Sequence, residues 1–352
     1  MNDLSHLFIN ETPLLDVRAP IEFKDGHFPG SVNRPLLNDE ERKQVGTLYR
    51  ERGQEAAIKL GHELVNGSVK EARVLTWIKF IDENPQAKLY CFRGGLRSKI
   101  SQEWIHAAGK SIEMIPGGYK AIRRFLITEL ESRSLDQSFL LLAGKTGCGK
   151  TEFLSRQPLP SLDLEKEACH RGSSFGYDGI QPSQVTFENR LAVGLIKTGL
   201  AKEVLIEDES IMIGKCVIPL VLFQAMKISK LIVLERGIED RTDHIIQEYV
   251  LNRISGGTCD PKPVYEELRE GLVRISKKLG GLKFHEIDQD LKSAFSSNEV
   301  IQLSAHRPWV LSLLKDYYDP HYERSLTKRK DKILFQGEAS GILEFLRNRI
   351  AT

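Results

Sequence analysis

The chain has 352 residues, of which 41% are hydrophobic and 28% charged, and its 50 Lys and Arg nearly balance its 48 Asp and Glu. This length exceeds the ~150 residues of one typical domain, so it predicts two domains, each with its own core. The composition excludes wholesale disorder, and the net charge of +2 excludes a global positive field as the means of attracting a polyanion.

The first third of the chain has the alternation of strands and helices that is typical of an α/β domain. Short apolar runs predict strands, at residues 14–17, 88–92 and 111–115. Helical spacing predicts helices, at residues 69–82, 96–108 and 119–133. A charged segment at about 38–67 interrupts the alternation and is predicted to be a helical insertion. The polar stretch 131–137 predicts the boundary, so the first domain is expected at 1–135.

The pattern restarts at Phe139 and predicts a second α/β domain at 136–352. Strands are expected at 139–143, near 162, at 204–207 and at 231–234. Helices are expected from 151 and at 182–197, and the C-terminal part is expected to be mostly helical and basic. Strands that alternate with helices predict a mainly parallel sheet.

No stretch predicts a membrane span, because the most apolar run, 217–223, is far shorter than the ~20 residues that a span needs. Asp3 and Glu11 stand where a signal peptide would carry basic residues. The five cysteines include no Cys-x-x-Cys pair, and a chain of this length needs no disulfides to fold. We therefore expect a cytoplasmic protein with no membrane partner.

Residues 144–151 read GKTGCGKT and fit G-x-x-x-x-G-K-[ST] at every fixed position, between a predicted strand and a predicted helix. Such a loop turns backbone N–H groups toward a phosphate, Lys150 adds a positive charge, and Thr151 can reach a magnesium ion. The predicted phosphate site comprises Gly144, Lys145, Thr146, Gly147, Cys148, Gly149, Lys150 and Thr151. The motif leaves open whether the phosphate belongs to a nucleotide or to another compound.

Two further groups of residues are candidates near this loop. Three acids, Glu207, Asp208 and Glu209, follow a predicted strand, where a carboxylate can face a bound magnesium ion. The alternative interpretation is a solvated acidic turn after the strand. His170 and Arg171 follow another strand end and are candidates for substrate contact or for a structural hydrogen bond. Cys148 is interpreted as a small packing residue.

Residues 90–98 read YCFRGGLRS and lie where a strand is predicted to give way to a helix. A thiol at a helix N-terminus beside arginines is favoured as a thiolate, so Cys91 is a candidate nucleophile. Arg93 and Arg97 are its predicted catalytic partners, with Arg97 able to donate two hydrogen bonds to an oxyanion. The rest of this predicted anion loop is Phe92, Gly94, Gly95, Leu96 and Ser98. The alternative is a buried structural cysteine.

The segment 16–35, DVRAPIEFKDGHFPGSVNRP, resembles the first signature of rhodanese domains, and the resemblance covers about residues 5–130. It places Cys91 where the active-site cysteine of that family lies. The spacing C-x5-R is one residue longer than in ordinary sulfur-transferring rhodaneses and equals that of cysteine phosphatases, so the loop encloses a larger anion. Tyr90, however, replaces the histidine that usually precedes a phosphatase cysteine.

Further motifs follow in a fixed order: PGGYKAIR at 116–123, the GKTGCGKT loop, HRGSSFG at 170–176, QPSQVTFEN at 181–189 and IEDES at 206–210. In this combination the chain resembles the tRNA 2-selenouridine synthase family. The resemblance implies that a wobble 2-thiouridine of tRNA is S-geranylated with geranyl diphosphate and then converted to 2-selenouridine with selenophosphate. It also implies that Cys91 carries or activates selenium. We assign the diphosphate of geranyl diphosphate to the 144–151 loop as a hypothesis.

The implied partners are the tRNA, the two small donors and an enzyme that supplies selenophosphate. A tRNA must meet positive charge, and the candidate contacts are Arg123, Arg124, Lys277, Lys278, Arg324, Lys328, Arg329, Lys330 and Lys332. Two rival readings remain open here. One is a P-loop kinase or ATPase with a regulatory rhodanese domain, and the other is a rhodanese-type cysteine phosphatase fused to a nucleotide-binding domain.

Overall fold

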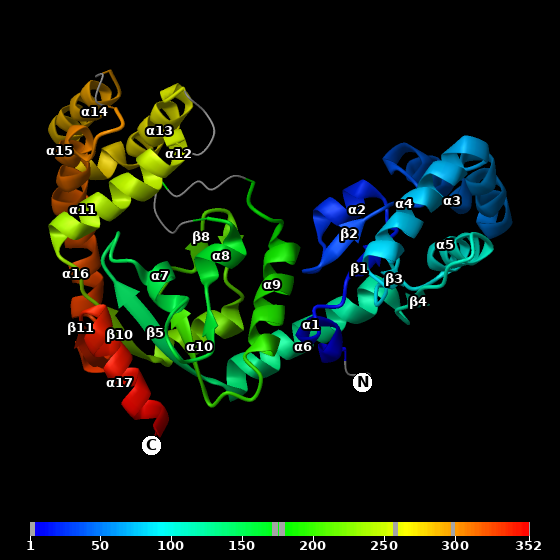
Figure 1. Cartoon of the computed structure of the whole chain (residues 1–352), viewed down its shortest axis with the longest axis horizontal. Helices are drawn as coiled ribbons and strands as arrows, with labels where there is room; N and C mark the ends of the chain where they lie inside the picture. Colours follow the sequence, from blue (N-terminus) through cyan, green and yellow to red (C-terminus); the bar gives the residue numbers. More distant parts are fainter. Residues whose placement is uncertain (1–3, 171–174, 176–179, 256–259, 297–299, 352) are drawn as a thin grey trace. The chain divides into compact units, whose positions relative to one another are not determined.

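The computed structural model describes residues 4–170, 175, 180–255, 260–296 and 300–351 (Figure 1). The chain forms two compact units, Met1–Asp136 with Pro182–Gly199, and Gln137–Gln181 with Leu200–Thr352. Each unit contains a parallel sheet with helices, so the predicted α/β fold class is confirmed. Among the described residues, no helix combines the length and the apolarity that crossing a bilayer requires.

The first unit is built on a four-stranded parallel sheet in the order β2-β1-β3-β4. Its strands are β1 (Leu14–Asp16), β2 (Ser31–Asn33), β3 (Lys88–Tyr90) and β4 (Glu113–Met114). Its helices are α1 (Ser5–Ile9), α2 (Pro20–Asp25), α3 (Asp39–Leu64), α4 (Gly67–Glu83), α5 (Leu96–Ala107), α6 (Gly118–Asp136) and α9 (Gln184–Lys197). The three predicted strands are confirmed, and β2 adds a three-residue edge strand whose side chains are only half-buried.

The predicted insertion is the helix α3 and the turn that leads to α4. Its N-terminus is set by a capping box, in which the Asn38 side chain accepts from the Glu41 amide and the Glu41 carboxylate accepts from the Asn38 amide. Gly53, at φ +82°, interrupts the helical geometry within α3. The polar stretch 131–137, expected as the domain boundary, contains the last turns of α6, which ends one residue before the second unit begins.

Helix α9 follows the P-loop in sequence and yet belongs to the first unit, where it packs on α6 and α1. Its apolar face buries Phe187, Leu191 and Leu195, spaced four residues apart. The main chain of His27 donates to Thr186 Oγ1 and accepts from Asn189 Nδ2, at 3.2 and 2.8 Å. The sequence predicted a contiguous second domain at 136–352, which would include α9. The amphipathic pattern of this helix shows that one of its faces is buried, but it does not show which unit buries that face.

The second unit is built on a five-stranded parallel sheet in the order β11-β10-β5-β7-β6. These strands are β5 (Ser138–Gly144), β6 (Ser161–Leu162), β7 (Glu203–Glu207), β10 (Lys230–Leu234) and β11 (Ile333–Gly337), and a small antiparallel pair is formed by β8 (Met212–Ile213) and β9 (Cys216–Val217). The four predicted strands are confirmed. The C-terminal part was expected to be mostly helical, but it also contains the strand β11. The alternating exposed and half-buried residues of this strand suit the edge of a sheet.

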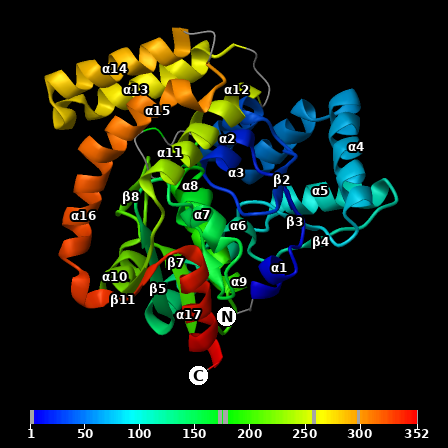
Figure 2. The ribbon, with the colours of Figure 1, turned by 60° about the vertical axis from the view of Figure 1, so that its left-hand side comes forward.

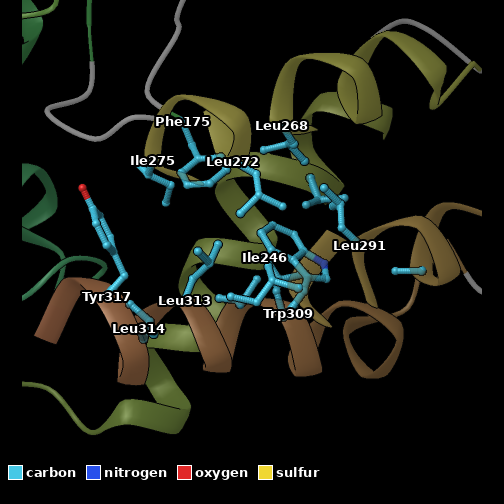
Figure 3. Close-up of a cluster of buried hydrophobic side chains, with 14 of the residues drawn as sticks. Phe175, Ile246, Leu268, Leu272, Ile275, Leu291, Trp309, Leu313, Leu314 and Tyr317 are labelled. Carbon is cyan, nitrogen blue, oxygen red and sulfur yellow. The ribbon is translucent and has the colours of Figure 1, made fainter. Parts of the chain in front are cut away.

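The remaining elements of this unit are helices. They are α7 (Lys150–Leu154), α8 (Leu164–Ala168), α10 (Leu220–Ile228), α11 (Ile238–Ile246), η1 (Gln247–Leu251), α12 (Asn252–Ser255), α13 (Lys262–Leu279), α14 (Gly281–Ser296), α15 (Leu303–Leu313), η2 (Leu314–Tyr318), α16 (Asp319–Thr327), η3 (Lys330–Lys332) and α17 (Ala339–Ala351). Figure 2 shows α16 running from the helical layer of α13–α15 toward the sheet edge at β11. Figure 3 shows the core of that layer, where Ile246, Leu272 and Trp309 converge from α11, α13 and α15.

Candidate functional site

Cys91 lies directly after β3, at the turn that leads into α5, as the sequence predicts. Only 3% of the residue is exposed, and it packs in the core that also contains Leu89 and Ile105. Gly95 forms the N-cap of α5. The thiol therefore stands between the end of a buried strand and a helix N-terminus, a position that favours an anion.

The 116–119 segment clamps the Cys91 loop through main-chain hydrogen bonds. The amide of Tyr119 donates to the Cys91 carbonyl at 2.8 Å, and the amide of Lys120 donates to the Phe92 carbonyl at 3.1 Å. Gly118 has φ +53°, and a Cβ there would collide with the Cys91 carbonyl oxygen and the Gly94 nitrogen. The paired glycines Gly117 and Gly118 are therefore part of the site. A plain turn would not need glycines packed this closely against the Cys91 loop.

Arg97 forms an ion pair with Glu22, so its side chain is not an unpaired cation beside the Cys91 loop. Its guanidinium donates to both carboxylate oxygens of Glu22, at 2.6 and 3.1 Å, and Arg42 contacts the same carboxylate at 3.1 Å. Burial acts to raise the pKa of Glu22, but its ion pair with Arg97 outweighs burial and holds that pKa below its ordinary value. Glu22 uses two of the five guanidinium N–H groups of Arg97, so an oxyanion could bind the remaining N–H groups or replace Glu22, whereas Arg93 is exposed.

Residues of the rhodanese-like signature, 16–35, contact the segment that holds the Cys91 loop. Asp16 and Arg18 form a fully buried bidentate pair, and Arg18 also donates to the Gly26 carbonyl at 2.8 Å. The Arg18 guanidinium lies 3.9 Å from the centroid of the Tyr119 ring. Ser98, which the sequence assigns to the anion loop, has a buried hydroxyl for which the described residues provide no hydrogen-bond partner.

The P-loop connects β5 to α7 and borders a cavity of about 1220 Å³. Gly147 and Gly149 have φ of +80° and +86°, the left-handed region in which successive N–H groups turn inward. The helix α7 has only five residues, so its dipole adds little, and the loop amides and Lys150 are the groups that could hold an anion. Cys148 is buried against Gly144, and burial raises the pKa of its thiol, which agrees with a packing role.

Acidic residues surround Lys150 in this cavity. Asp163, Glu165 and Glu209 line the same wall. Burial acts to lower the pKa of Lys150, but the surrounding groups raise it on balance, so the ammonium group stays charged. Burial raises the pKa of Glu209 to about 7. Asp163 and Glu165 were not identified from the sequence. Asp163 directly follows a strand, and an acid in that position is the signal that identified residues 207–209.

The three acids predicted as metal ligands have different surroundings. Asp208 forms a bidentate pair with Arg329, at 2.6 and 2.7 Å, and only Glu209 lines the cavity without an ion pair to arginine. Glu207 is fully buried, and burial raises its pKa well above its ordinary value. The described residues contain no group of three or more His, Cys, Asp or Glu arranged around one metal position. Thr151 and Glu209 supply the oxygen ligands that suit a magnesium ion held mainly by phosphate and water.

The side chain of Lys145 anchors the P-loop and does not enter the cavity. Its ammonium group contacts Glu323 at 2.7 Å and Asp319 at 3.4 Å. Asp319 also pairs with Arg241, which donates to the Thr146 carbonyl at 3.1 Å. Arg241 and Asp319 could not be identified in the sequence because both lie in helices far from the loop. His170 lines the cavity, and Arg171 lies outside the described residues.

A small apolar cavity adjoins the P-loop. Its volume is about 30 Å³, and its walls include Phe175 together with Trp309 and Leu313 of α15 (Figure 3). Thr146, Ile245 and Tyr249 line both this cavity and the large one. The anion site and an apolar wall are therefore contiguous.

The basic residues expected to contact tRNA divide into three groups. Arg123 is engaged inside the first unit, where it pairs with Glu188 and donates to Asn189 Oδ1 at 2.8 Å, so its guanidinium already has partners within the protein. Arg329 pairs with Asp208 in the P-loop cavity, and Lys332 also lines that cavity. The exposed remainder comprises Arg124, Lys277, Lys278, Arg324, Lys328 and Lys330.

Comparison with known proteins assigns both units. Residues 137–352 match the family described as tRNA 2-selenouridine synthase AAA domain, and residues 2–124 match the rhodanese-like domain. The tRNA 2-selenouridine synthase of Hahella chejuensis is 44% identical, over 99% of this chain and 95% of that protein. Those of Shewanella halifaxensis and Alcanivorax borkumensis are 42% and 43% identical, each over 99% of this chain and 98% of the relative. The chain is therefore an enzyme that belongs to the tRNA 2-selenouridine synthase family.

Proposed function

We propose that this enzyme replaces the sulfur of a wobble 2-thiouridine in tRNA with selenium, in two steps that use two anion sites. Family membership supports the overall change, from thiolated to selenated tRNA. The identity of the donors, geranyl diphosphate and selenophosphate, comes from the resemblance of the motifs, and the geometry of each site supports its share of the chemistry.

In the first step, the thiocarbonyl sulfur attacks the allylic carbon of geranyl diphosphate. A carbon–sulfur bond forms, the carbon–oxygen bond breaks, and diphosphate leaves. In the second step, selenium attacks the ring carbon, geranyl thiolate leaves, and water cleaves the selenium–phosphorus bond to give phosphate. Alkylation favours the second step because the thiocarbonyl sulfur is a poor leaving group, whereas the alkylated sulfur leaves as a thiolate.

The P-loop is assigned to the diphosphate of the first step. Its inward-turned amides and the charged Lys150 bind phosphate groups, and Thr151 with Glu209 suit a magnesium ion that would neutralise the leaving diphosphate. The observation that carries this assignment is the boundary formed by Thr146, Ile245 and Tyr249, where the anion cavity meets apolar side chains. The small cavity has room for only about one or two water molecules, so the apolar chain of a phosphate ester would lie in the large cavity, against Ile245 and Tyr249.

The Cys91 loop is assigned to selenophosphate. The longer C-x5-R spacing suits a tetrahedral anion, and Arg93 is exposed beside the loop to attract one. Cys91 stands at the start of the loop, where its side chain would activate the bound selenophosphate for this transfer, with no change in the oxidation state of selenium. Arg97, held by Glu22, positions the loop and could bind the anion through its remaining N–H groups or in exchange for Glu22.

Mass spectrometry of tRNA nucleosides tests the two assignments separately. Thiolated tRNA is incubated with the enzyme and each donor, alone and together. We expect Cys91→Ser to form geranylated thiouridine but no selenouridine, and Lys150→Ala to geranylate at least tenfold more slowly. Full selenation by Cys91→Ser would overturn the role given to that thiol, and normal geranylation by Lys150→Ala would overturn the role given to the P-loop.

The rival functions are tested with the same preparations. A kinase or ATPase would consume ATP at Lys150 without tRNA. A phosphatase would release phosphate from an aryl phosphate through Cys91. We expect neither activity to exceed the background of the Lys150→Ala and Cys91→Ser variants.

A further inference from the structure

A cavity of about 810 Å³ lies in the first unit, between α3 and the Cys91 loop. One wall contains Phe92, Arg97 and Tyr119, and the opposite wall is the α3 segment 42–50. We call this cavity the α3 groove. Its size falls in the range of sites that bind small molecules or single nucleotides.

The charge of the α3 groove is positive where it is open to solvent. Its two acidic residues are Glu22, which is neutralised by Arg97 and Arg42, and Asp25. Lys43 and Arg50 also line the groove, are exposed, and have no ion pair within the described part of the chain. Two free cations on one helix face are suited to the phosphates of a nucleic acid strand.

The groove also offers aromatic surfaces. Tyr49 lines it from α3 and is 55% exposed, which is unusual for a ring that has an apolar core available. On the other wall, the rings of Phe92 and Tyr119 are stacked, with centroids 5.9 Å apart. Gly46 also lines the groove, and a Cβ at this position would meet no atom within 4 Å. Exposed rings beside unpaired cations are the recurring features of surfaces that bind single-stranded nucleic acid.

We propose that the α3 groove binds single-stranded RNA and holds the unpaired nucleotide next to the Cys91 loop, with a base stacked on Tyr49 and neighbouring phosphates at Lys43 and Arg50. This inference rests on the proposed function, since it takes tRNA as the substrate, and it names the surface that receives the RNA. The helical insertion is thereby given a purpose: it supplies the wall that an ordinary sheet-and-helix unit would lack.

The test measures RNA binding and not turnover. The probe is a fluorescently labelled 17-nucleotide stem-loop with 2-thiouridine in the loop, and the readout is fluorescence anisotropy with the full-length enzyme. We expect Tyr49→Ala to raise the Kd by about 5- to 100-fold, the value of one base–aromatic stack, and Tyr49→Phe to restore most of the affinity. The double variant Lys43→Ala, Arg50→Ala should also reduce the salt dependence of log K by about 1.4, for two lost single-strand phosphate contacts.

Arg52→Ala is the matched control, because Arg52 is exposed on the same helix but does not line the groove. Circular dichroism confirms that each variant is folded. If Tyr49→Ala and the double variant bind the stem-loop as tightly as Arg52→Ala does, the groove proposal is wrong and the proposed function is untouched. If the unaltered enzyme does not bind the stem-loop at all, the proposed function fails as well. If inorganic phosphate displaces nothing from the groove while unlabelled single-stranded RNA competes fully, a small-anion site is excluded in favour of RNA.

Discussion

The guanidinium of Arg97 donates to both carboxylate oxygens of Glu22, at 2.6 and 3.1 Å, and so joins the Cys91 loop to α2. Arg42 of α3 contacts the same carboxylate at 3.1 Å. Three segments of the first unit therefore converge on one acidic side chain. This arrangement makes Glu22 a positioning residue for the loop, through Arg97.

Glu22→Gln removes the charge that these two arginines share. We expect the free energy of unfolding to fall by about 1–3 kcal/mol at pH 7.5, the range for hydrogen bonds to charged groups. The pKa of Glu22 is held below its ordinary value, so its stabilisation is present above the unfolded pKa of ~4.3 and is lost as the pH falls through the folded pKa. Urea unfolding at pH 7.5 and pH 3 measures this, and the difference between the two proteins should be smaller at pH 3 than at pH 7.5. Glu51→Gln, at an exposed acid of α3, should show no difference at either pH.

Gly118→Ala tests the clamp on the Cys91 loop. A Cβ at this position meets the Cys91 carbonyl oxygen and the Gly94 nitrogen, and φ is +53°. We expect a loss of about 1–3 kcal/mol of stability together with a loss of selenation, while geranylation by the other unit continues. Gly95→Ala is the control, because its φ is −98° and a Cβ there meets nothing within 4 Å. Equal selenation by the two variants would contradict the clamp.

The sequence predicted the elements whose signals are local. Long apolar runs located β5, β7 and β10, and fixed glycine spacing located the phosphate loop, because glycine and an apolar strand are both required within a few residues. The Cys91 loop was located in the same way. These predictions depend on chain geometry that neighbouring residues determine by themselves.

What the sequence did not predict depends on partners distant in the chain. Arg329 looked like one of a run of basic RNA contacts, and its pairing with Asp208, 121 residues away, is visible only in the fold. Lys145 is as basic as Lys150, but only the structure shows that Asp319 and Glu323 hold its ammonium group. A motif fixes where the backbone turns; it does not fix which side chains already have partners.

Glu209→Gln tests the electrostatics of the P-loop cavity. Burial raises the pKa of Glu209 to about 7, above the ~4.3 of an unfolded Glu, so the folded state holds a proton that the unfolded state releases between these values. Stability therefore falls as the pH rises from ~4 to ~7, and the cost is fully present at pH 8. We expect Glu209→Gln to be more stable than the unaltered enzyme by roughly 3–4 kcal/mol at pH 8 and equal to it at pH 4, in denaturant unfolding. Glu152→Gln, at an exposed acid beside the same loop, should show no such trend.

The basic segment before β11 separates into two roles that substitution can distinguish. Lys328 and Lys330 are exposed, whereas Arg329 is bound to Asp208 through two hydrogen bonds. We expect the double variant Lys328→Ala, Lys330→Ala to weaken tRNA binding by roughly 3- to 10-fold at low salt and to reduce its salt dependence, since phosphate contacts release counterions. Arg329→Ala should leave tRNA binding unchanged and lower the stability by about 1–3 kcal/mol, because it leaves the partly buried Asp208 carboxylate without its partner. Filter binding at several salt concentrations together with thermal unfolding measures both effects. Equal loss of tRNA affinity in the two variants would return Arg329 to the RNA surface, and no loss in either would place the RNA contacts elsewhere on the enzyme.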